Sequence, residues 1–202
     1  MNNVNRCNNG HLFNQQRGHR RGPSSYHMHD ADVVFEQLNI KKGDSFLDLG
    51  CGAGDYSIEA AKMVGESGEV YALDIWEEVL DGLSDRAVTN GYKNIKTKVS
   101  DIKDKISVDD NSIDICFIAT VLHSLNLIED AERMFDEIRR ILKSDGRMVI
   151  IECKKTNASF GPPLNCRISP EELEQIVKPY GFEKINYVDL GYNYMISFSN
   201  NK

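Results

Sequence analysis

Short apolar runs of strand length alternate along the chain with longer segments in which apolar residues recur at helical spacing. The strand-like runs are "SFLDL" from Ser45, "EVYAL" from Glu69, "NIKTKVS" from Asn94, "IDICFIAT" from Ile113 and "RMVIIE" from Arg147. Such alternation builds parallel sheets, because two parallel neighbours need a crossover connection between them. We therefore predict an α/β fold with helices on both faces of a mostly parallel sheet.

Helical patterns lie before, between and after these runs. They are "ADVVFEQLNI" from Ala31, "YSIEAAKMV" from Tyr56, "EEVLDGLSDRAVTN" from Glu77, "EDAERMFDEIRRIL" from Glu129 and "SPEELEQIVKPYG" from Ser169. A turn, "SDG" at 144–146, is expected before the fifth strand. The last two runs, "EKINYVDL" and "YNYMISFS", have only Gly191 between them, which favours an antiparallel hairpin. Five strand–helix units followed by a hairpin predict a doubly wound, three-layer fold.

Composition limits the class of protein. A chain of 202 residues suits one domain, and a net charge of −7 is unfavourable for binding nucleic acid or an anionic membrane. Five cysteines without a CxxC pair are typical of reduced thiols, so we expect a cytoplasmic protein without a membrane span or secretory signal. Acidic residues are absent before Asp30. We expect residues 1–25 to be a mobile, basic arm and residues 26–202 to be the folded domain.

The residues at the carboxyl ends of the strands indicate a ligand site, because ligands of doubly wound sheets bind there. Three glycines follow the first strand, and a single carboxylate follows each of the next two. The residues in question are Gly50, Cys51, Gly52, Ala53, Gly54, Asp74, Asp101, Ile102, Ala119, Thr120 and His123. A carboxylate at Asp74 is placed to accept both hydroxyls of a ribose. We expect these elements to converge on one crevice of nucleoside size.

The glycine segment does not fit a dinucleotide. The pattern G-x-G-x-x-G fails because Asp55 occupies the place of the third glycine, where a carboxylate would repel a pyrophosphate. The Lys-Ser/Thr pair of a P-loop is also missing. Asp48, an acid inside an otherwise apolar strand, indicates a cationic or amine-bearing ligand. Together these features favour a nucleoside without a pyrophosphate.

From about Phe46 to Phe198 the sequence resembles the class I S-adenosylmethionine-dependent methyltransferases, in particular the small-molecule, UbiE-like (type 11) group. "FLDLGCGAG" resembles the first motif of that family, "VYALDI" the second, "SDI" the third, "IDICFIATVLHSL" the fourth and "ILKSDGRMVIIE" the fifth. The fifth motif departs from the family's usual proline and glycine, since residues 144–146 keep only the glycine. The resemblance implies the strand order 3-2-1-4-5-7-6 and S-adenosyl-L-methionine as cofactor.

The resemblance also implies roles for individual residues. The cofactor-binding set is Asp48, Gly50, Cys51, Gly52, Gly54, Asp74, Ile75, Asp101, Ile102, Ala119 and Thr120. In this set the glycine backbone carries the methionine part, Asp48 lies near its amino group, and Asp74 holds the ribose. Ile75, Asp101, Ile102 and Ala119 surround the adenine. His123, at the end of the fourth motif, is a site-lining residue or a catalytic base. No metal is expected, because the spacings of Cys7 and the histidines of the arm match no zinc pattern.

Several alternatives stay open at this point. The glycine turn is also compatible with a plain strand–helix connection, and the two aspartates with capping of the loops that follow them. Tyr26, His27 and His29 are candidates for a lid, and "FGPPLNCR" from Phe160 for a wall of the acceptor pocket. Arg167 either pairs with an acidic acceptor or is solvated.

The main hypothesis is methyl transfer to an unidentified small molecule. Its rivals are a methylase of RNA or protein, a non-catalytic S-adenosylmethionine-binding module, and a nicotinamide-dependent oxidoreductase. Neither the acceptor nor the oligomeric state is indicated by the sequence.

Overall fold

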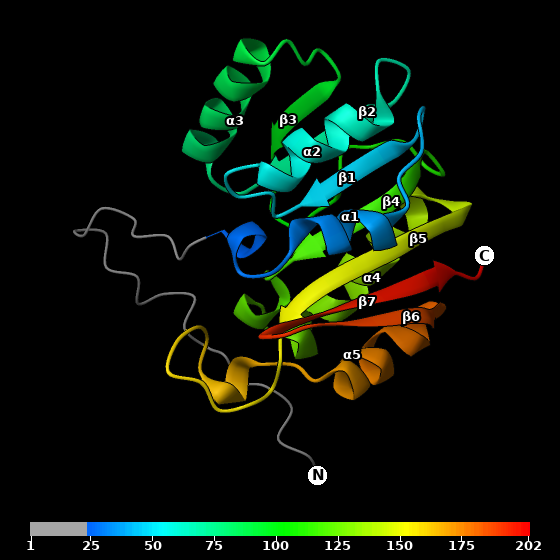
Figure 1. Cartoon of the computed structure of the whole chain (residues 1–202). Helices are drawn as coiled ribbons and strands as arrows, with labels where there is room; N and C mark the ends of the chain where they lie inside the picture. The colour runs from blue at the N-terminus through cyan, green and yellow to red at the C-terminus, as the bar shows by residue number, and fades with distance from the viewer. Residues whose placement is uncertain (1–23) are drawn as a thin grey trace.

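The computed structural model describes residues 24–202, which form a seven-stranded sheet between two layers of helices (Figure 1). The strands are β1 (Ser45–Leu49), β2 (Glu69–Asp74), β3 (Ile95–Val99), β4 (Ile113–Ala119), β5 (Leu142–Cys153), β6 (Phe182–Leu190) and β7 (Asn193–Asn200). Their order is β3-β2-β1-β4-β5-β7-β6, with β7 antiparallel to both of its neighbours and the other pairs parallel. The predicted fold class, strand order and hairpin are confirmed.

The helices lie on both faces of the sheet, as predicted. They are α1 (Ala31–Leu38), α2 (Asp55–Val64), α3 (Glu77–Thr89), α4 (Leu127–Ile141) and α5 (Pro170–Val177), with short 3-10 turns η1 (Ser25–His27), η2 (Leu122–Ser124), η3 (Leu164–Cys166) and η4 (Lys178–Tyr180). Helices α1 to α3 cover one face, while α4 and α5 cover the other (Figure 1). Helix α5 begins with the expected capping box, in which Ser169 and Glu172 each accept a hydrogen bond from the other's backbone N–H.

The central strands are buried on both faces, because alternate side chains of a strand point in opposite directions. In β4, Ile115 and Phe117 belong to the core beneath α1 and α2, whereas Cys116 and Ile118 belong to the core beneath α4 and α5. All four side chains are inaccessible to solvent. This arrangement holds the carboxyl ends of the strands in fixed positions, and the candidate site lies at those ends.

The expectation of five strand–helix units is wrong at one place, because no helix follows β3. Residues 100–112 run irregularly to β4, yet Ile102 and Ile106 are buried in the core. Helix α4 supplies the polar partners of this segment: Glu137 accepts the backbone N–H of Ile106 at 3.0 Å, and Arg140 donates to the Ile106 carbonyl at 2.7 Å. Side chains therefore satisfy buried backbone groups that a helix would otherwise satisfy internally.

The turn expected at 144–146 lies within β5 as an irregularity instead of preceding it. Helix α4 ends at Ile141 and β5 begins at the next residue. Ile113 pairs with Leu142 while Ile115 pairs with Arg147, so the register against β4 shifts and residues 143–146 bulge out. A Cβ on Gly146 would lie 2.8 Å from the Ile113 carbonyl oxygen, so only glycine fits the bulge.

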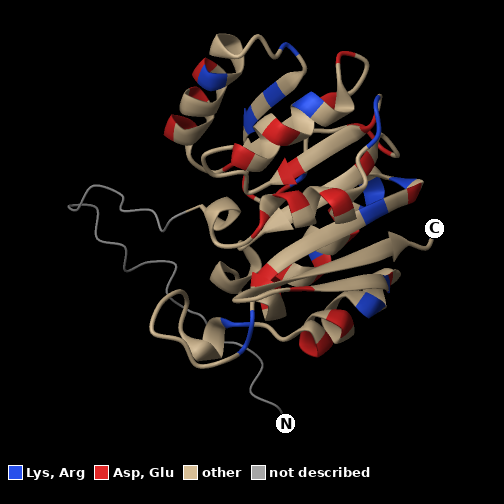
Figure 2. Ribbon diagram, viewed as in Figure 1, with Lys and Arg blue, Asp and Glu red and all other residues tan. Residues whose placement is uncertain are grey.

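Acidic and basic residues occur in helices, strands and loops throughout the described chain (Figure 2). Within residues 24–202, no helix has the length and apolar character that crossing a membrane requires. The predicted arm, residues 1–25, lies almost entirely outside the described residues.

Candidate functional site

The glycine segment lies where the winding of the sheet reverses, between β1 and β4. Gly50, Gly52 and Gly54 have φ values of +82°, +53° and +77°, in the left-handed region that favours glycine. The backbone N–H groups of Gly50 and Cys51 both donate to the carbonyl of Leu73 at the end of β2, at 2.8 and 2.9 Å. The segment is thereby fixed at the carboxyl edge of the sheet.

The three glycines differ in what lies where a side chain would be. A Cβ on Gly50 would lie 2.5 Å from Val121, and one on Gly54 would lie 2.5 Å from Leu83. Around the corresponding position on Gly52 nothing lies within 4 Å. The density of glycines therefore reflects close packing at two positions, and an open approach to the backbone at Gly52 alone.

Asp74, the last residue of β2, connects the glycine segment with the loop that follows β2. Its carboxylate accepts the backbone N–H of Gly52 at 2.9 Å and that of Trp76 at 3.0 Å. The next side chain, Ile75, is 51% exposed beside this carboxylate. The arrangement places an acid and an apolar side chain close to the open glycine, and their roles toward a ribose and an adenine stay predictions.

Asp48 is almost completely buried one strand away. Its carboxylate accepts a hydrogen bond from the Ser57 hydroxyl of α2 at 2.6 Å. Burial raises the pKa of Asp48 to about 7; the Ser57 hydrogen bond lowers it, and the negative charge of Asp74 raises it further. A cationic group beside Asp48 would relieve this cost, which is consistent with the predicted amine-bearing ligand.

The third predicted acid, Asp101, lies after β3 and is partly exposed. Its carboxylate accepts the backbone N–H of Lys103 at 2.9 Å and lies 3.5 Å from the Lys103 ammonium. It therefore caps a loop, as one of the alternatives held, while its side chain stays accessible. Ile102 is only 6% exposed and belongs to the core beneath α4, so little of its side chain faces the crevice.

The chain leaves β4 in a strained conformation. Thr120 has φ of +56°, which is rare for a β-branched residue. Its hydroxyl donates to the Ala119 carbonyl at 2.8 Å, and its N–H donates to the Ile151 carbonyl of β5 at 2.7 Å. The turn directs Val121 against Gly50 and brings His123 to the same edge of the sheet. Strain of this kind is concentrated at functional sites.

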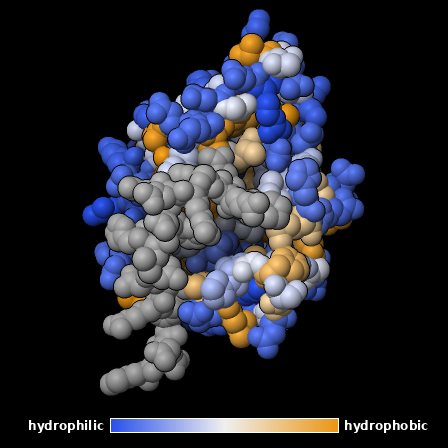
Figure 3. All heavy atoms as spheres, turned by 90° about the vertical axis from the view of Figure 1, so that its left-hand side faces the viewer, coloured by the Kyte–Doolittle hydropathy of each residue, from blue (hydrophilic) through white to orange (hydrophobic). Residues whose placement is uncertain are grey.

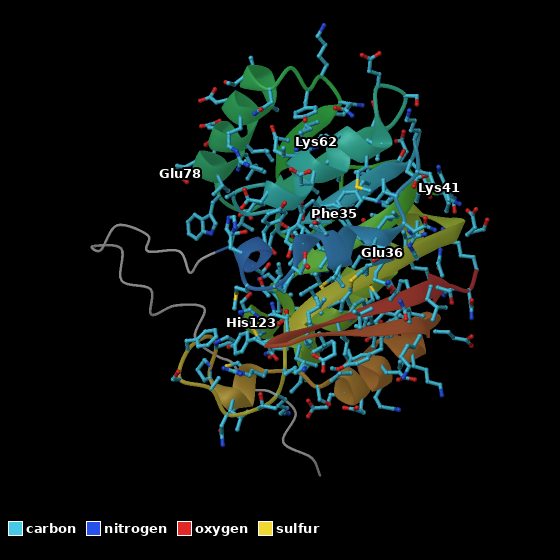
Figure 4. All side chains as sticks on the ribbon, in the orientation of Figure 1. Phe35, Glu36, Lys41, Lys62, Glu78 and His123 are labelled. Atoms are coloured by element: carbon cyan, nitrogen blue, oxygen red, sulfur yellow. The ribbon has the colours of Figure 1, made fainter. Side chains whose placement is uncertain are left out.

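His123 lies at this edge, below the glycine segment in the view of Figure 4. Its Nδ1 is 2.9 Å from the carboxylate of Glu152, which is completely buried in β5. Glu152 also accepts the backbone N–H groups of His123 and Cys153, each at 3.3 Å. Glu152 was not among the site residues predicted from the sequence. The signal that could have identified it is an acidic residue at the end of an apolar strand, the same signal that identified Asp74.

The loop after β5 is held together by Arg167. This side chain is 2% exposed and donates four hydrogen bonds of 2.8 to 3.2 Å. The acceptors are the carbonyls of Lys154, Thr156, Phe160 and Pro162. Both expectations for Arg167, an acidic acceptor or solvation, are wrong, because the loop itself supplies the partners of the guanidinium.

The same loop encloses a hollow of about 260 Å³ lined by residues 156–164 and Arg167. Exposed apolar side chains at the carboxyl-end face include Ile75, Trp76, Phe160 and Leu164. Figure 3 views this side of the molecule, where hydrophobic patches lie among hydrophilic surface. The loop lies at the carboxyl-end side of the sheet, and the role of "FGPPLNCR" as a wall of the acceptor pocket stays a prediction.

The described part of the predicted lid packs over α2. The ring of Tyr26 meets Tyr56 edge to face at 5.2 Å between centroids. His29 forms hydrogen bonds with the Tyr56 hydroxyl at 2.8 Å and with the Asn193 amide of β7 at 3.2 Å. Burial lowers the pKa of His29. The segment thus bridges α2 and the hairpin at the carboxyl-end side of the sheet, and its role as a lid stays a prediction.

Two further expectations concern side chains near the glycines. Cys51 and Cys116 are buried thiols, as expected for small core residues. Asp55, which takes the place of a third glycine, forms an ion pair with Arg86 of α3 at 2.9 Å.

Among residues 24–202, no group of three or more His, Cys, Asp or Glu side chains is arranged to hold a metal ion.

Comparisons with known proteins agree with this geometry. A family model described as a methyltransferase domain matches residues 40–179. A demethylmenaquinone methyltransferase of Lactobacillus johnsonii is 40% identical over 120 residues, which are 58% of this chain and 47% of the relative. A ubiquinone/menaquinone biosynthesis C-methyltransferase of Azotobacter vinelandii is 33% identical over 129 residues, which are 63% of this chain and 50% of the relative. The chain thus spans about half the length of the curated relatives it matches.

Among solved structures, a SAM-dependent methyltransferase from Aquifex aeolicus is 31% identical with a TM-score of 0.78. The match covers 88% of this chain and 93% of that one. The open backbone at Gly52 and the adjacent carboxylate of Asp74 fit a nucleoside cofactor whose amino-acid part lies on the glycine segment. The chain therefore belongs to the methyltransferase-domain family, as an S-adenosylmethionine-dependent methyltransferase of class I.

Proposed function

We propose that the protein transfers the methyl group of S-adenosylmethionine to a small organic molecule with a quinone-type aromatic ring. The observation that carries the proposal is one continuous edge of the sheet. On it, the open backbone of Gly52 is followed by Val121 and His123, and the apolar loop after β5 borders the same edge. The cofactor supplies an activated methyl group on a positively charged sulfur. What the chain adds is alignment of the acceptor with that methyl group.

Each side of this edge has a distinct role in the proposal. Asp74 binds the ribose hydroxyls, and Asp48 binds the ammonium group. Asp101 accepts the adenine amino group. Ile75, exposed beside Asp74, packs against the base. The acceptor enters on the other side, between His123 and the loop held by Arg167, where Phe160 and Leu164 provide apolar contact.

The choice of a quinone-type ring rests on the relatives, whose names refer to menaquinone and ubiquinone. A net charge of −7, with acidic and basic residues both distributed along the described chain, favours a small acceptor over a polyanion such as RNA (Figure 2). We place the reaction in the cytoplasm, as the sequence predicted.

The test is transfer of a labelled methyl group into an extract of the source organism, divided into small-molecule, protein and nucleic-acid fractions. We expect the label in an apolar small molecule with an aromatic ring. Asp74→Ala abolishes the transfer, whereas Asp145→Asn, an exposed substitution at the opposite end of the sheet, leaves it unchanged. Label confined to protein or nucleic acid would contradict the proposed acceptor. Tight binding of S-adenosylhomocysteine without label in any fraction would favour a non-catalytic module.

A further inference from the structure

His123 and Glu152 form a buried pair beside the acceptor side of the site. We propose that His123 is the catalytic base of the methyl transfer and that Glu152 is its positioning residue. The proposal rests on the proposed function and adds to it a chemical requirement, namely that the quinone-type ring is bound in its reduced, hydroxyl-bearing form (a quinol) and loses a proton from one of those hydroxyl groups. The pair joins the ends of two neighbouring strands, because His123 follows β4 and Glu152 lies near the end of β5.

The environment of Glu152 determines which nitrogen of the imidazole carries the proton. The carboxylate is completely buried and accepts hydrogen bonds from the backbone N–H groups of His123 and Cys153. A third hydrogen bond joins it to the Nδ1 of His123, and the tautomer of the ring decides which of the two is the donor. An ionised carboxylate only accepts hydrogen bonds, so Nδ1 carries the hydrogen. The other nitrogen, Nε2, then has a free electron pair while the ring is neutral. This is the tautomer that a general base requires, and a buried carboxylate on Nδ1 fulfils the same function in Ser-His-Asp hydrolases.

The position of His123 is that of a site residue rather than of a core histidine. Its side chain is 20% exposed, and no residue of the described range 24–202 forms a hydrogen bond with its Nε2. Two residues earlier, Val121 packs against Gly50 of the cofactor segment. Figure 4 shows His123 between the start of α1 and the loop after β5. The partly exposed ring of His123 at this edge is accessible to an acceptor bound beside the cofactor segment.

Two charged groups act on the ring. Burial by itself lowers the pKa of His123, but the hydrogen bond and the negative charge of Glu152 outweigh burial and raise that pKa above its ordinary value. The buried guanidinium of Arg167 partly opposes Glu152. A histidine with a raised pKa is a stronger base for a weakly acidic hydroxyl group, and it remains largely neutral above that pKa.

The balanced step begins with the acceptor. Its O–H proton passes to Nε2, and the electron pair left on oxygen is delocalised to the neighbouring ring carbon. That carbon forms a bond with the methyl group while the carbon–sulfur bond breaks, its electron pair staying on sulfur. The ring carbon then loses its C–H proton to the solvent, and the imidazolium returns its proton to the oxygen. One proton is released per methyl group transferred, and no oxidant or reductant takes part.

The first test measures the pair without turnover. NMR of the His123 ring nitrogens is recorded against pH in the full chain saturated with S-adenosylhomocysteine. We expect the neutral ring to carry its hydrogen on Nδ1. We also expect Glu152→Gln to lower the pKa of His123, because the substitution removes the negative charge. Glu183→Gln, an exposed change on β6, is the matched control and leaves the titration unchanged. An unchanged titration in Glu152→Gln, or hydrogen on Nε2, would overturn the role of Glu152.

The second test uses the small-molecule fraction that the wild-type protein labels. We expect His123→Asn to bind S-adenosylhomocysteine like wild type and to transfer methyl about 100-fold more slowly at pH 7. The deficit narrows at pH 9, because the acceptor hydroxyl then ionises without a base. A deficit that is independent of pH, equal rates for the two proteins, or a labelled product without a ring hydroxyl would overturn the inference and leave the proposed function intact. If wild type labels no small molecule, the proposed function fails, and the catalytic role fails with it, whatever the NMR titration shows.

Discussion

Asp48→Asn tests how the protein balances stability against cofactor binding. The carboxyl group of Asp48 is fully buried, and burial raises its pKa from 3.8 to about 7. Between about pH 4 and pH 7 the folded protein therefore holds a proton that the unfolded chain has released. The native state binds more protons than the unfolded state in this window, so stability increases as pH falls through 7 and changes little above it.

The magnitude follows from the size of the shift. Each pH unit in the window corresponds to about 1.4 kcal/mol, so wild type gains about 2 to 3 kcal/mol over Asp48→Asn between pH 8 and pH 5. For a protein of this size that is a relative change of about 5 to 10 °C in Tm. The assay is thermal and urea unfolding of both proteins at several pH values. Asp145→Asn, whose side chain is exposed, is the matched control and keeps the pH dependence of wild type. Parallel stability curves for wild type and Asp48→Asn would refute the reasoning.

The same carboxylate must be ionised to bind an ammonium group. At pH 6 about nine tenths of it is protonated if its pKa is about 7, so S-adenosylhomocysteine is expected to bind about tenfold more weakly at pH 6 than at pH 8. Asp48→Asn removes this pH dependence and weakens binding at pH 8. Calorimetry at the two pH values measures both effects. Equal affinities of the wild-type protein at pH 6 and pH 8 would show that Asp48 does not contact the ammonium group.

Four further substitutions separate cofactor binding from stability. Asp74→Asn removes a charged acceptor from the ribose, so the Kd for S-adenosylhomocysteine rises about 10- to 100-fold in calorimetry; an unchanged Kd would contradict the assignment. Gly52→Ala and Gly54→Ala both place alanine at a positive φ, but only Gly54→Ala also places its Cβ 2.5 Å from Leu83, whereas Gly52→Ala meets no atom within 4 Å. Gly54→Ala is therefore expected to lower Tm more and Gly52→Ala to weaken binding more; the opposite ranking would be evidence against the open approach at Gly52. Arg167→Lys supplies three donors at one point instead of a planar fork. It is expected to lower the unfolding free energy by about 3 kcal/mol and to speed proteolysis of the loop after β5. No change in either measurement would contradict the role of Arg167 in holding this loop together.

Much of the site was predictable because of a simple topological rule. In a doubly wound sheet, residues that follow parallel strands meet at one edge. The rule predicts that Gly52, Asp74 and His123 lie at one edge, and the structure places all three there. It also reached Asp101, whose carboxylate caps a loop while remaining partly exposed.

Two features of the structure that the sequence did not predict also have physical reasons. From the sequence, Arg167 is expected to be a surface cation or to pair with an acidic ligand. In the structure, the irregular backbone of the loop leaves carbonyl groups that need buried donors, and the guanidinium of Arg167 donates to four of them. Residues 100–112 need no helix, because Glu137 and Arg140, which lie 31 and 34 positions beyond Ile106, supply polar partners to its backbone. Neither compensation leaves a local pattern.

Hydrophobic periodicity determined the layers and the terminal hairpin, and the position of residues after the strands indicated the edge at which a ligand is expected. The strand order followed from the resemblance of five sequence motifs to the methyltransferase family. Tertiary structure decided which glycine is open, which acid is buried and which carboxylate orients His123. Val121 and Leu83 fill the space beside Gly50 and Gly54, and Glu152 forms a hydrogen bond with His123. These residues belong to other elements of the fold, and contacts between residues distant in sequence arise only when the chain packs. Local spacing specifies where a side chain emerges, whereas its neighbours determine its charge and its access to a ligand.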